Sequence, residues 1–139
     1  MRRVFIDTAF LIARYDPRDS LHQIALRLFD ELDSAPAQFF TSHLVLAEFL
    51  AYFSRSPLSI RRGAAEYVTL LLNRPDLTVV DLTPELFRRG FDLYRARPDK
   101  RYSLADCVSM TVCADLSITE VLTSDTDFES EGLEILLKD

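Results

Sequence analysis

Two carboxylates in this chain stand in apolar surroundings, where an ionised side chain is costly unless something binds it. Asp7 directly follows the apolar run 4–6, and Glu48 lies within the apolar stretch 44–53. If residues 44–53 form a helix, the residues three and four positions from Glu48 are apolar or aromatic, so Glu48 should face the core. A carboxylate there must be protonated, paired with a cation or bound to a metal. A buried ion pair with an arginine is the purely structural alternative.

Three further carboxylates lie at expected strand ends and helix starts. Asp106 ends the sequence Ser103-Leu104-Ala105-Asp106, whose spacing is that of a capping box that satisfies backbone amides at a helix start. Asp125 and Asp127 follow an expected strand, although Ser-Asp-Thr-Asp is also ordinary turn composition. A helix cap and a metal ligand are compatible roles, because the second carboxylate oxygen stays free. Each of these acids taken alone therefore has a structural explanation.

The joint pattern favours a metal site. Strand ends and helix starts meet at one edge of a parallel sheet, and carboxylates gathered there raise one another's pKa unless a cation is present. An all-oxygen ligand set suits Mg²⁺ or Mn²⁺, not zinc. His22, which we expect at the surface, and His43 are too isolated for a zinc site. The candidate ligands are Asp7, Glu48, Asp106 and the pair Asp125 and Asp127.

The elements that must position these acids alternate between strands and helices. Apolar runs predict strands at 4–6, 38–41, 78–82, 120–123 and 133–137. Helical spacing and start signals predict helices at 9–13, 21–32 with Ser20 as N-cap, 44–53, 57–73, 84–97 and 103–116. This alternation predicts one α/β domain over residues 1–139, with a parallel sheet covered by helices on both faces. With 3 glycines and none after the first strand, the chain has no P-loop or dinucleotide-binding fingerprint.

The charge of the chain is mixed. A net charge of −6 argues against a protein that holds nucleic acid by bulk positive potential. Of the 16 basic residues only Lys100 and Lys138 are lysines, so 14 are arginines, the side chain that grips phosphate through two parallel hydrogen bonds. Ion pairing on helix surfaces is the structural alternative. The clustered basic residues are Arg55, Arg61, Arg62, Arg88, Arg89, Arg95, Arg97, Lys100 and Arg101.

Nothing in the chain predicts a membrane segment. No window approaches the roughly 18 apolar residues of a membrane span. Cys107 and Cys113 are six residues apart in one expected helix and point in different directions, so we expect both to be reduced and buried. Reduced cysteines are typical of a cytoplasmic protein.

Four short motifs occur in an order that resembles the PIN-domain ribonucleases, most closely the small single-domain toxins of the VapC type. The resemblance covers essentially the whole chain, and the motifs are specific as a set. They are Phe5-Ile6-Asp7-Thr8, Thr41-Ser42-His43-Leu44-Val45-Leu46-Ala47-Glu48, Ser103-Leu104-Ala105-Asp106 and Thr123-Ser124-Asp125-Thr126-Asp127-Phe128.

The resemblance implies a three-layer α/β/α fold with a central parallel sheet of four to five strands, and a Mg²⁺- or Mn²⁺-dependent endoribonuclease. It also implies an RNA substrate, a homodimer and a small antitoxin partner. By the same resemblance Asp7, Glu48 and Asp106 are metal ligands, Asp125 is the fourth acid, and Asp127 is secondary. Thr8 is expected to support Asp7 through its hydroxyl, and Ser124 is a second supporting residue.

Two other functions fit the same elements. One is a catalytically silent module that binds nucleic acid or protein, in which the acids serve only as caps and buried pairs. The other is a phosphatase or receiver-like phosphoacceptor with an aspartate nucleophile. That class uses a nearby lysine, and this chain offers only Lys100 and Lys138.

Overall fold

The chain folds around a five-stranded parallel sheet. The computed structural model describes residues 1–139. The strands lie in the order β3-β2-β1-β4-β5, and every neighbouring pair is parallel. β1 is therefore the central strand, as its near-continuous apolar sequence predicts for a strand buried on both faces. The strands are β1 (Arg2–Ile6), β2 (Ala37–Ser42), β3 (Leu77–Val80), β4 (Glu120–Leu122) and β5 (Glu134–Ile135).

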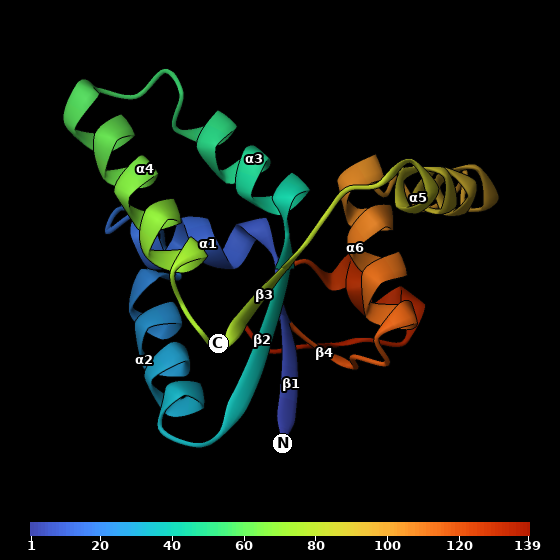
Figure 1. Cartoon of the computed structure of the whole chain (residues 1–139), viewed down its shortest axis with the longest axis horizontal. Coiled ribbons are helices and arrows are strands. Elements are labelled where there is room, and N and C mark those ends of the chain that lie inside the picture. The colour runs from blue at the N-terminus through green and yellow to red at the C-terminus, as the bar shows by residue number, and fades with distance from the viewer.

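Helices cover both faces of the sheet, which confirms the predicted three-layer α/β/α fold (Figure 1). One layer holds α1 (Thr8–Tyr15), α2 (His22–Asp33), α3 (His43–Tyr52) and α4 (Leu58–Leu72). The other layer holds α5 (Pro84–Ala96) and α6 (Leu104–Asp115), and the 3₁₀ helix η1 (Thr126–Glu131) packs against α6. No helix combines the length and the apolar character that crossing a membrane requires.

The strand order creates a switch point beside β1. From β1 the chain moves through β2 to β3 with its connecting helices in one layer, and then crosses to β4 on the other side of β1 with helices in the second layer. In open parallel sheets the crevice at such a point, outside the carboxyl ends of the strands, is where ligands bind. Here Asp7 follows β1 and residues 123–125 follow β4, so both border this crevice.

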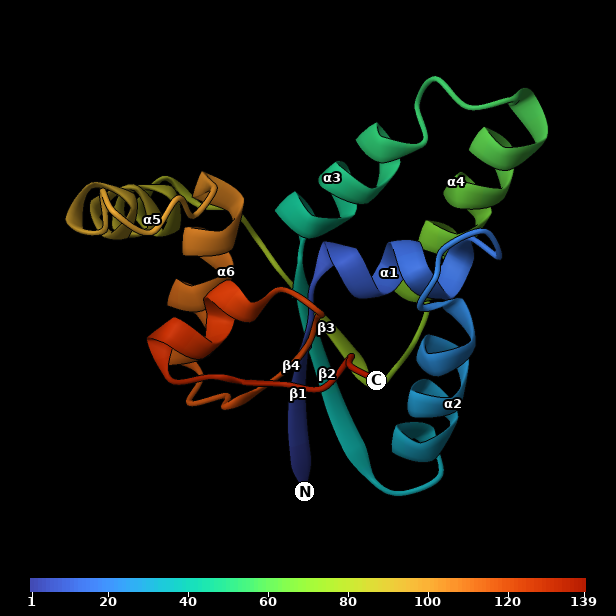
Figure 2. The ribbon, with the colours of Figure 1, turned by 180° about the vertical axis from the view of Figure 1, so that it is seen from behind.

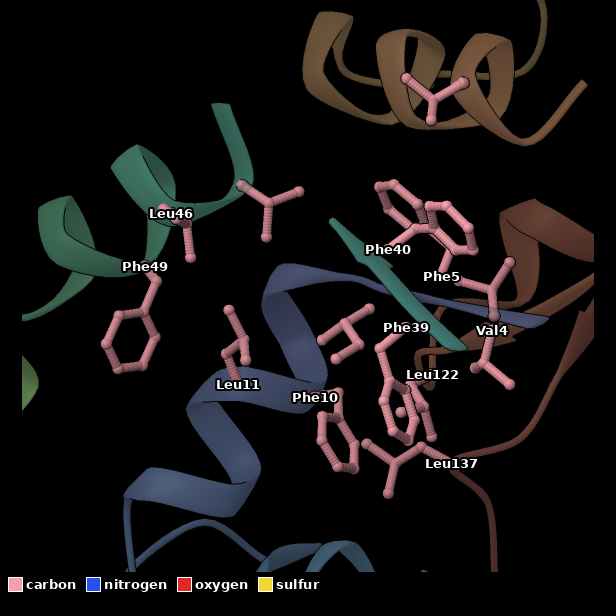
Figure 3. Packing of buried hydrophobic residues seen from close by; sticks show 14 of the residues in the cluster. Val4, Phe5, Phe10, Leu11, Phe39, Phe40, Leu46, Phe49, Leu122 and Leu137 are labelled. Carbon is pink, nitrogen blue, oxygen red and sulfur yellow. The ribbon is translucent and has the colours of Figure 1, made fainter. Parts of the chain in front are cut away.

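Aromatic residues of the central strands fill the core on both sides of the sheet. Phe5 and Phe40 are register partners and lie together on one side, and Phe10 and Phe39 lie on the other (Figure 3). Phe29 of α2 packs against Phe39 and Phe10, with ring centroids 5.3 and 6.0 Å apart. This two-sided packing fixes β1, and with it the position at which Asp7 leaves the sheet.

Helix α6 is buried along most of its length, as its apolar sequence predicts. Residues 107–113 are all buried, and Cys107 and Cys113 are both free. Burial raises the pKa of the Cys107 thiol to about 11 and that of the Cys113 thiol to about 12, so neither thiol is reactive near neutral pH.

The predicted N-cap of α2 and the predicted extent of the last strand are wrong, and β3 ends at Val80, two residues before its predicted end. Ser20 does not cap α2: the helix begins at His22, and the Asp19 carboxylate instead accepts the Leu21 amide at 2.9 Å in a local turn. The last strand is restricted to Glu134–Ile135, because the preceding residues form η1 and Gly132 ends that helix in the left-handed conformation. The observed strand is therefore shorter than the predicted strand 133–137 at both ends.

Candidate metal centre

Asp7 is a buried carboxylate at the carboxyl end of the central strand. The residue is 6% exposed, and its side chain does not cap α1, which begins at the next residue. Its Oδ2 instead accepts a hydrogen bond of 2.8 Å from the Thr123 hydroxyl, which follows β4. Burial raises the pKa of Asp7 to about 7, against the hydrogen bond from Thr123, and the charges of Asp106 and Glu48 raise it further. An ionised Asp7 is therefore destabilising in the absence of a cation.

Glu48 lies at the border of the crevice, not in the core, so the prediction that it faces the core is wrong. It is half-buried, and the core side of α3 is made by Val45, Leu46 and Phe49. Because α3 is apolar on almost all sides, apolar neighbours at helical spacing do not identify its buried face. Thr8 donates a hydrogen bond of 2.9 Å to Glu48 Oε1. No arginine pairs with Glu48, which removes the structural alternative.

Asp106 forms the predicted capping box at the start of α6. The Ser103 hydroxyl accepts the Asp106 amide at 3.0 Å, and Asp106 Oδ2 accepts the Ser103 amide at 3.2 Å. Burial raises the pKa of Asp106, the hydrogen bonds from Ser103 lower it, and the charges of Asp125 and Glu48 raise it. The capping role is thus real, and Oδ1 is left free for a ligand.

Asp125 and Asp127 join Asp106 in a compact group of acids, which we call the aspartate trio. One carboxylate oxygen from each of the three lies within 4.8 Å of the others, and all three residues are half-buried. Asp125 is the N-cap of η1, where its Oδ1 accepts the Asp127 amide at 2.9 Å. Burial and the charge of Asp125 raise the pKa of Asp127. The structure therefore brings both members of the pair into the group, instead of favouring Asp125.

Electrostatic coupling connects the trio to the two remaining acids. The charges of Asp106 and Glu48 act on Asp7, and those of Asp125 and Glu48 act on Asp106. Asp7 and Glu48 nevertheless lie outside the group whose oxygens are within 4.8 Å of one another. None of the five acids forms an ion pair with a lysine or arginine. A set of carboxylates without cationic partners fits a hard divalent cation.

The supporting residues differ from those predicted. The Thr8 hydroxyl donates to Glu48, and only the Thr8 backbone binds Asp7. Ser124 makes no side-chain hydrogen bond, whereas Thr123 both donates to Asp7 and accepts the Asp125 amide at 3.1 Å. Thr123 was not among the predicted site residues, because a threonine inside a strand sequence is an ordinary β-former. Its place two residues before Asp125 was the only available signal.

Neither histidine belongs to the acidic cluster. His43 Nδ1 lies 3.0 Å from Asp81 Oδ1, beyond the end of β3. His22 was expected at the surface, but it is half-buried and its Nδ1 lies 2.7 Å from the Ala13 carbonyl. The absence of histidine from the site agrees with an oxygen-only set of ligands.

The profile of the PIN domain matches residues 4–131. The chain belongs to the PIN-domain family. A search among curated proteins found no match, but solved structures resemble the chain over almost its full length. VapC20 of Mycobacterium tuberculosis, described as a sarcin-ricin loop cleaving toxin, is 27% identical with a TM-score of 0.79, over 94% of this chain and 95% of that chain.

Two VapBC complexes have the same fold at lower identity. VapBC2 of Rickettsia felis, bound to a DNA fragment from its promoter, gives a TM-score of 0.68 at 14% identity, over 96% of this chain and 97% of that chain. DNA-bound VapBC of Salmonella typhimurium gives 0.67 at 17%, over 98% of both chains. Membership of the PIN family and the likeness to VapC20 support a nuclease of the toxin–antitoxin class.

Proposed function

We propose that this PIN domain is a metal-dependent endoribonuclease and the toxin of a toxin–antitoxin pair. The observation that carries the proposal is the convergence of Asp106, Asp125 and Asp127 within 4.8 Å, at the crevice that Asp7 and Glu48 also border. None of these acids forms an ion pair with a lysine or an arginine. Membership of the PIN family and the likeness to VapC20 support the same reading.

The ligands of the metal come from this cluster. Mg²⁺ or Mn²⁺ is the best fit, because every donor is a carboxylate oxygen. A cation held by these residues would lower the pKa of a bound water and offset the negative charge of a phosphodiester. Hydrolysis adds the water oxygen to phosphorus and releases an alcohol, so the protein needs no nucleophile of its own. The proposed ligands are Asp7, Glu48, Asp106, Asp125 and Asp127.

Two threonines orient the acids on either side of the crevice. Thr123 holds Asp7 through its hydroxyl proton and the Asp125 backbone through its hydroxyl oxygen, so one side chain ties β1 to the start of η1. Thr8 fixes the Glu48 carboxylate from the first turn of α1. Hydrogen bonds of this kind set the direction in which a ligand presents its free oxygen.

The basic residues that form no ion pair are the proposed contacts for RNA. Arg88, Arg89 and Arg97 pair with acids, as the structural alternative predicts. Lys100 lies near enough to the cluster for its charge to lower the pKa of Asp127, so we place a phosphate contact there. Such contacts position the RNA backbone and read no sequence. The exposed arginines without an ion pair that could extend this surface include Arg55, Arg61, Arg62, Arg95 and Arg101.

A small antitoxin and a second copy of the chain are the proposed protein partners. The VapBC structures are complexes, and these support an antitoxin for this chain. The homodimer is supported by Phe87, Phe91 and Tyr94, which are exposed at one face of α5 at helical spacing. Light scattering of the wild type and of Phe91→Arg tests the dimer. We place the protein in the cytoplasm, in agreement with its free cysteines.

Cleavage of RNA by the purified chain tests the nuclease. Total RNA is incubated with the protein in Mg²⁺, in Mn²⁺ or in excess chelator, and the new ends are sequenced. The expected result is cut sites that depend on the cation and vanish with Asp106→Asn. A ribosomal RNA fragment that contains the sarcin-ricin loop forms a separate arm, because VapC20 is described as cleaving that loop.

The same samples separate the competing functions. RNA that stays intact in both cations, with no metal binding by the chain, would support a silent binding module. A phosphoacceptor would instead form an aspartyl-phosphate on treatment with an acyl phosphate. A label on Asp7 in that experiment would overturn the nuclease.

A further inference from the structure

A carboxylate outside the aspartate trio ties together the two segments that carry it. Asp125 and Asp127 belong to η1 and its N-cap, whereas Asp106 lies in the first turn of α6. η1 packs beside α6, as the red and orange segments of Figure 2 show. The side chain of Glu131, the last residue of η1, accepts three hydrogen bonds.

Glu131 accepts hydrogen bonds from both sides of the connection between α5 and α6. Arg97, the C-cap of α5, donates from Nε at 3.1 Å and from Nη2 at 3.3 Å. The buried Tyr102 hydroxyl donates at 2.9 Å. Tyr102 directly precedes Ser103, whose amide binds Asp106. A continuous chain of contacts therefore runs from the end of η1 to the first acid of the trio.

This connection opposes a specific force. Three carboxylates within 4.8 Å of one another repel, so without a cation η1 is pushed away from the start of α6. A six-residue 3₁₀ helix resists poorly on its own, since its hydrogen bonds have unfavourable geometry. The anchor at Glu131 holds the far end of η1 while the repulsion acts at its beginning.

We propose that Glu131, Tyr102 and Arg97 are positioning residues that hold the aspartate trio at the spacing a divalent cation requires. The inference rests on the proposed metal centre and adds residues that touch neither the cation nor the RNA. Their contribution is preorganisation: the trio is assembled before the cation arrives, so less binding free energy is lost in drawing η1 and α6 together.

The test is the affinity of the full chain for Mn²⁺, measured by isothermal titration calorimetry. Tyr102→Phe and Glu131→Ala are expected to bind Mn²⁺ about tenfold more weakly, at the low end of the range for outer-shell partners. Glu120→Ala is the matched control, because Glu120 also binds an arginine through two hydrogen bonds and its side chain is 21% exposed, against 17% for Glu131. Tyr67→Phe controls for loss of a tyrosine hydroxyl, which there accepts a hydrogen bond from Arg14.

Hydrogen exchange without metal gives a second readout. Faster exchange of the η1 amides is expected in Tyr102→Phe and Glu131→Ala, and wild-type exchange in both controls. Tyr102→Phe keeps the buried ring, so it remains informative if Glu131→Ala folds poorly.

The possible results distinguish a failure of the positioning role from a failure of the proposed metal centre. Wild-type Mn²⁺ affinity in both variants would overturn the positioning role, even if both lose stability, because loss of stability alone is what Glu120→Ala reports. A wild-type chain that binds no Mn²⁺ would overturn the metal centre and the positioning role together.

Discussion

The two ends of the parallel strands treat acidic side chains in opposite ways. At the amino-terminal end, Arg2 binds Glu120 with two hydrogen bonds of 2.8 and 2.7 Å. Arg74 binds Asp33 at 2.9 Å and Asp76 at 2.7 Å. The hydrogen bonds from these arginines lower the pKa of Glu120 and of Asp76. Acids at this end are stabilised as carboxylates by the fold itself.

At the carboxyl-terminal end the acids have no such partners. Asp7, Asp106 and Asp127 have raised pKa values, with burial as the largest cause in each. Scarcity of cations does not explain the difference, because the chain has 16 basic residues. The contrast indicates that one end contributes to stability, and that the other keeps a repelling cluster whose charge is balanced by a bound ion.

The largest expected effect of that contrast is on catalysis. Asp7→Asn or Asp106→Asn should lower the rate of RNA cleavage about 10³-fold, equivalent to roughly 4 kcal/mol of transition-state stabilisation. Glu120→Ala should stay within about twofold of wild type, because its ion pair lies at the other end of the sheet. Single-turnover cleavage of one RNA substrate measures all three. An equal loss of cleavage rate in Glu120→Ala and in the two aspartate variants would contradict the functional difference between the two ends.

The next effect concerns stability and pH without metal. The pKa of Asp7 is raised to about 7 in the folded chain, against roughly 3.9 when unfolded. The folded state therefore binds the additional proton between these values, and stability falls as pH rises from about 4 to about 7. Asp7→Asn removes this penalty, so its stability relative to wild type should rise by on the order of 2 to 4 kcal/mol from pH 4 to pH 8.

Urea unfolding in chelator at several pH values checks this sign. Glu120 is the control, because its pKa is lowered: its stabilisation is present above its unfolded pKa and is lost only as pH falls through the folded value. The difference between Glu120→Ala and wild type should therefore be constant between pH 5 and pH 8. If Asp7→Asn instead destabilises the chain equally at pH 5 and pH 8, Asp7 has a structural role.

A bound metal ion should offset the repulsion among the acids at the carboxyl-terminal end of the strands, and should leave the ion pairs at the amino-terminal end unaffected. At a Mn²⁺ concentration about 100 times the dissociation constant, the free energy of unfolding should rise by about 2.7 kcal/mol. Thermal unfolding should show this shift in the wild type and in Glu120→Ala, and lose it in Asp106→Asn. An undiminished shift in Asp106→Asn would place the bound ion elsewhere.

The fold was predictable from the sequence because its signals are local. The apolar run before Asp7, the capping box that begins at Ser103 and the alternation of strands with helices all depend on neighbouring residues, and the structure confirms them. The short elements were harder: β5 has two residues, and η1 replaces a predicted turn. Elements of this length gain their stability from tertiary contacts, which the sequence does not display.

The site was predictable in its residue types and less so in its arrangement. Strand order decides which ends meet, so Asp7 and the acids after β4 could be placed together once β1 was central. Which side of α3 faces the core could not be inferred, and Glu48 was misplaced for that reason. The hydroxyl of Thr123 and the anchor at Glu131 act across the tertiary fold, 116 and 29 residues from their partners, and no local pattern reveals them.

The smallest expected effect is the loss of stability at the amino-terminal end of the strands. Glu120→Ala should cost only about 0.2–1 kcal/mol, because the ion pair with Arg2 is partly exposed and solvent screens it. Glu48→Gln is the paired measurement: it removes a charge from the cluster and keeps an acceptor for the Thr8 hydroxyl, so metal-free stability should stay equal or rise. Urea unfolding at pH 8 in chelator, where the cluster is most charged, compares the two. A loss in Glu48→Gln as large as that in Glu120→Ala would mean that both ends stabilise the fold alike, and no ion would be needed to explain either.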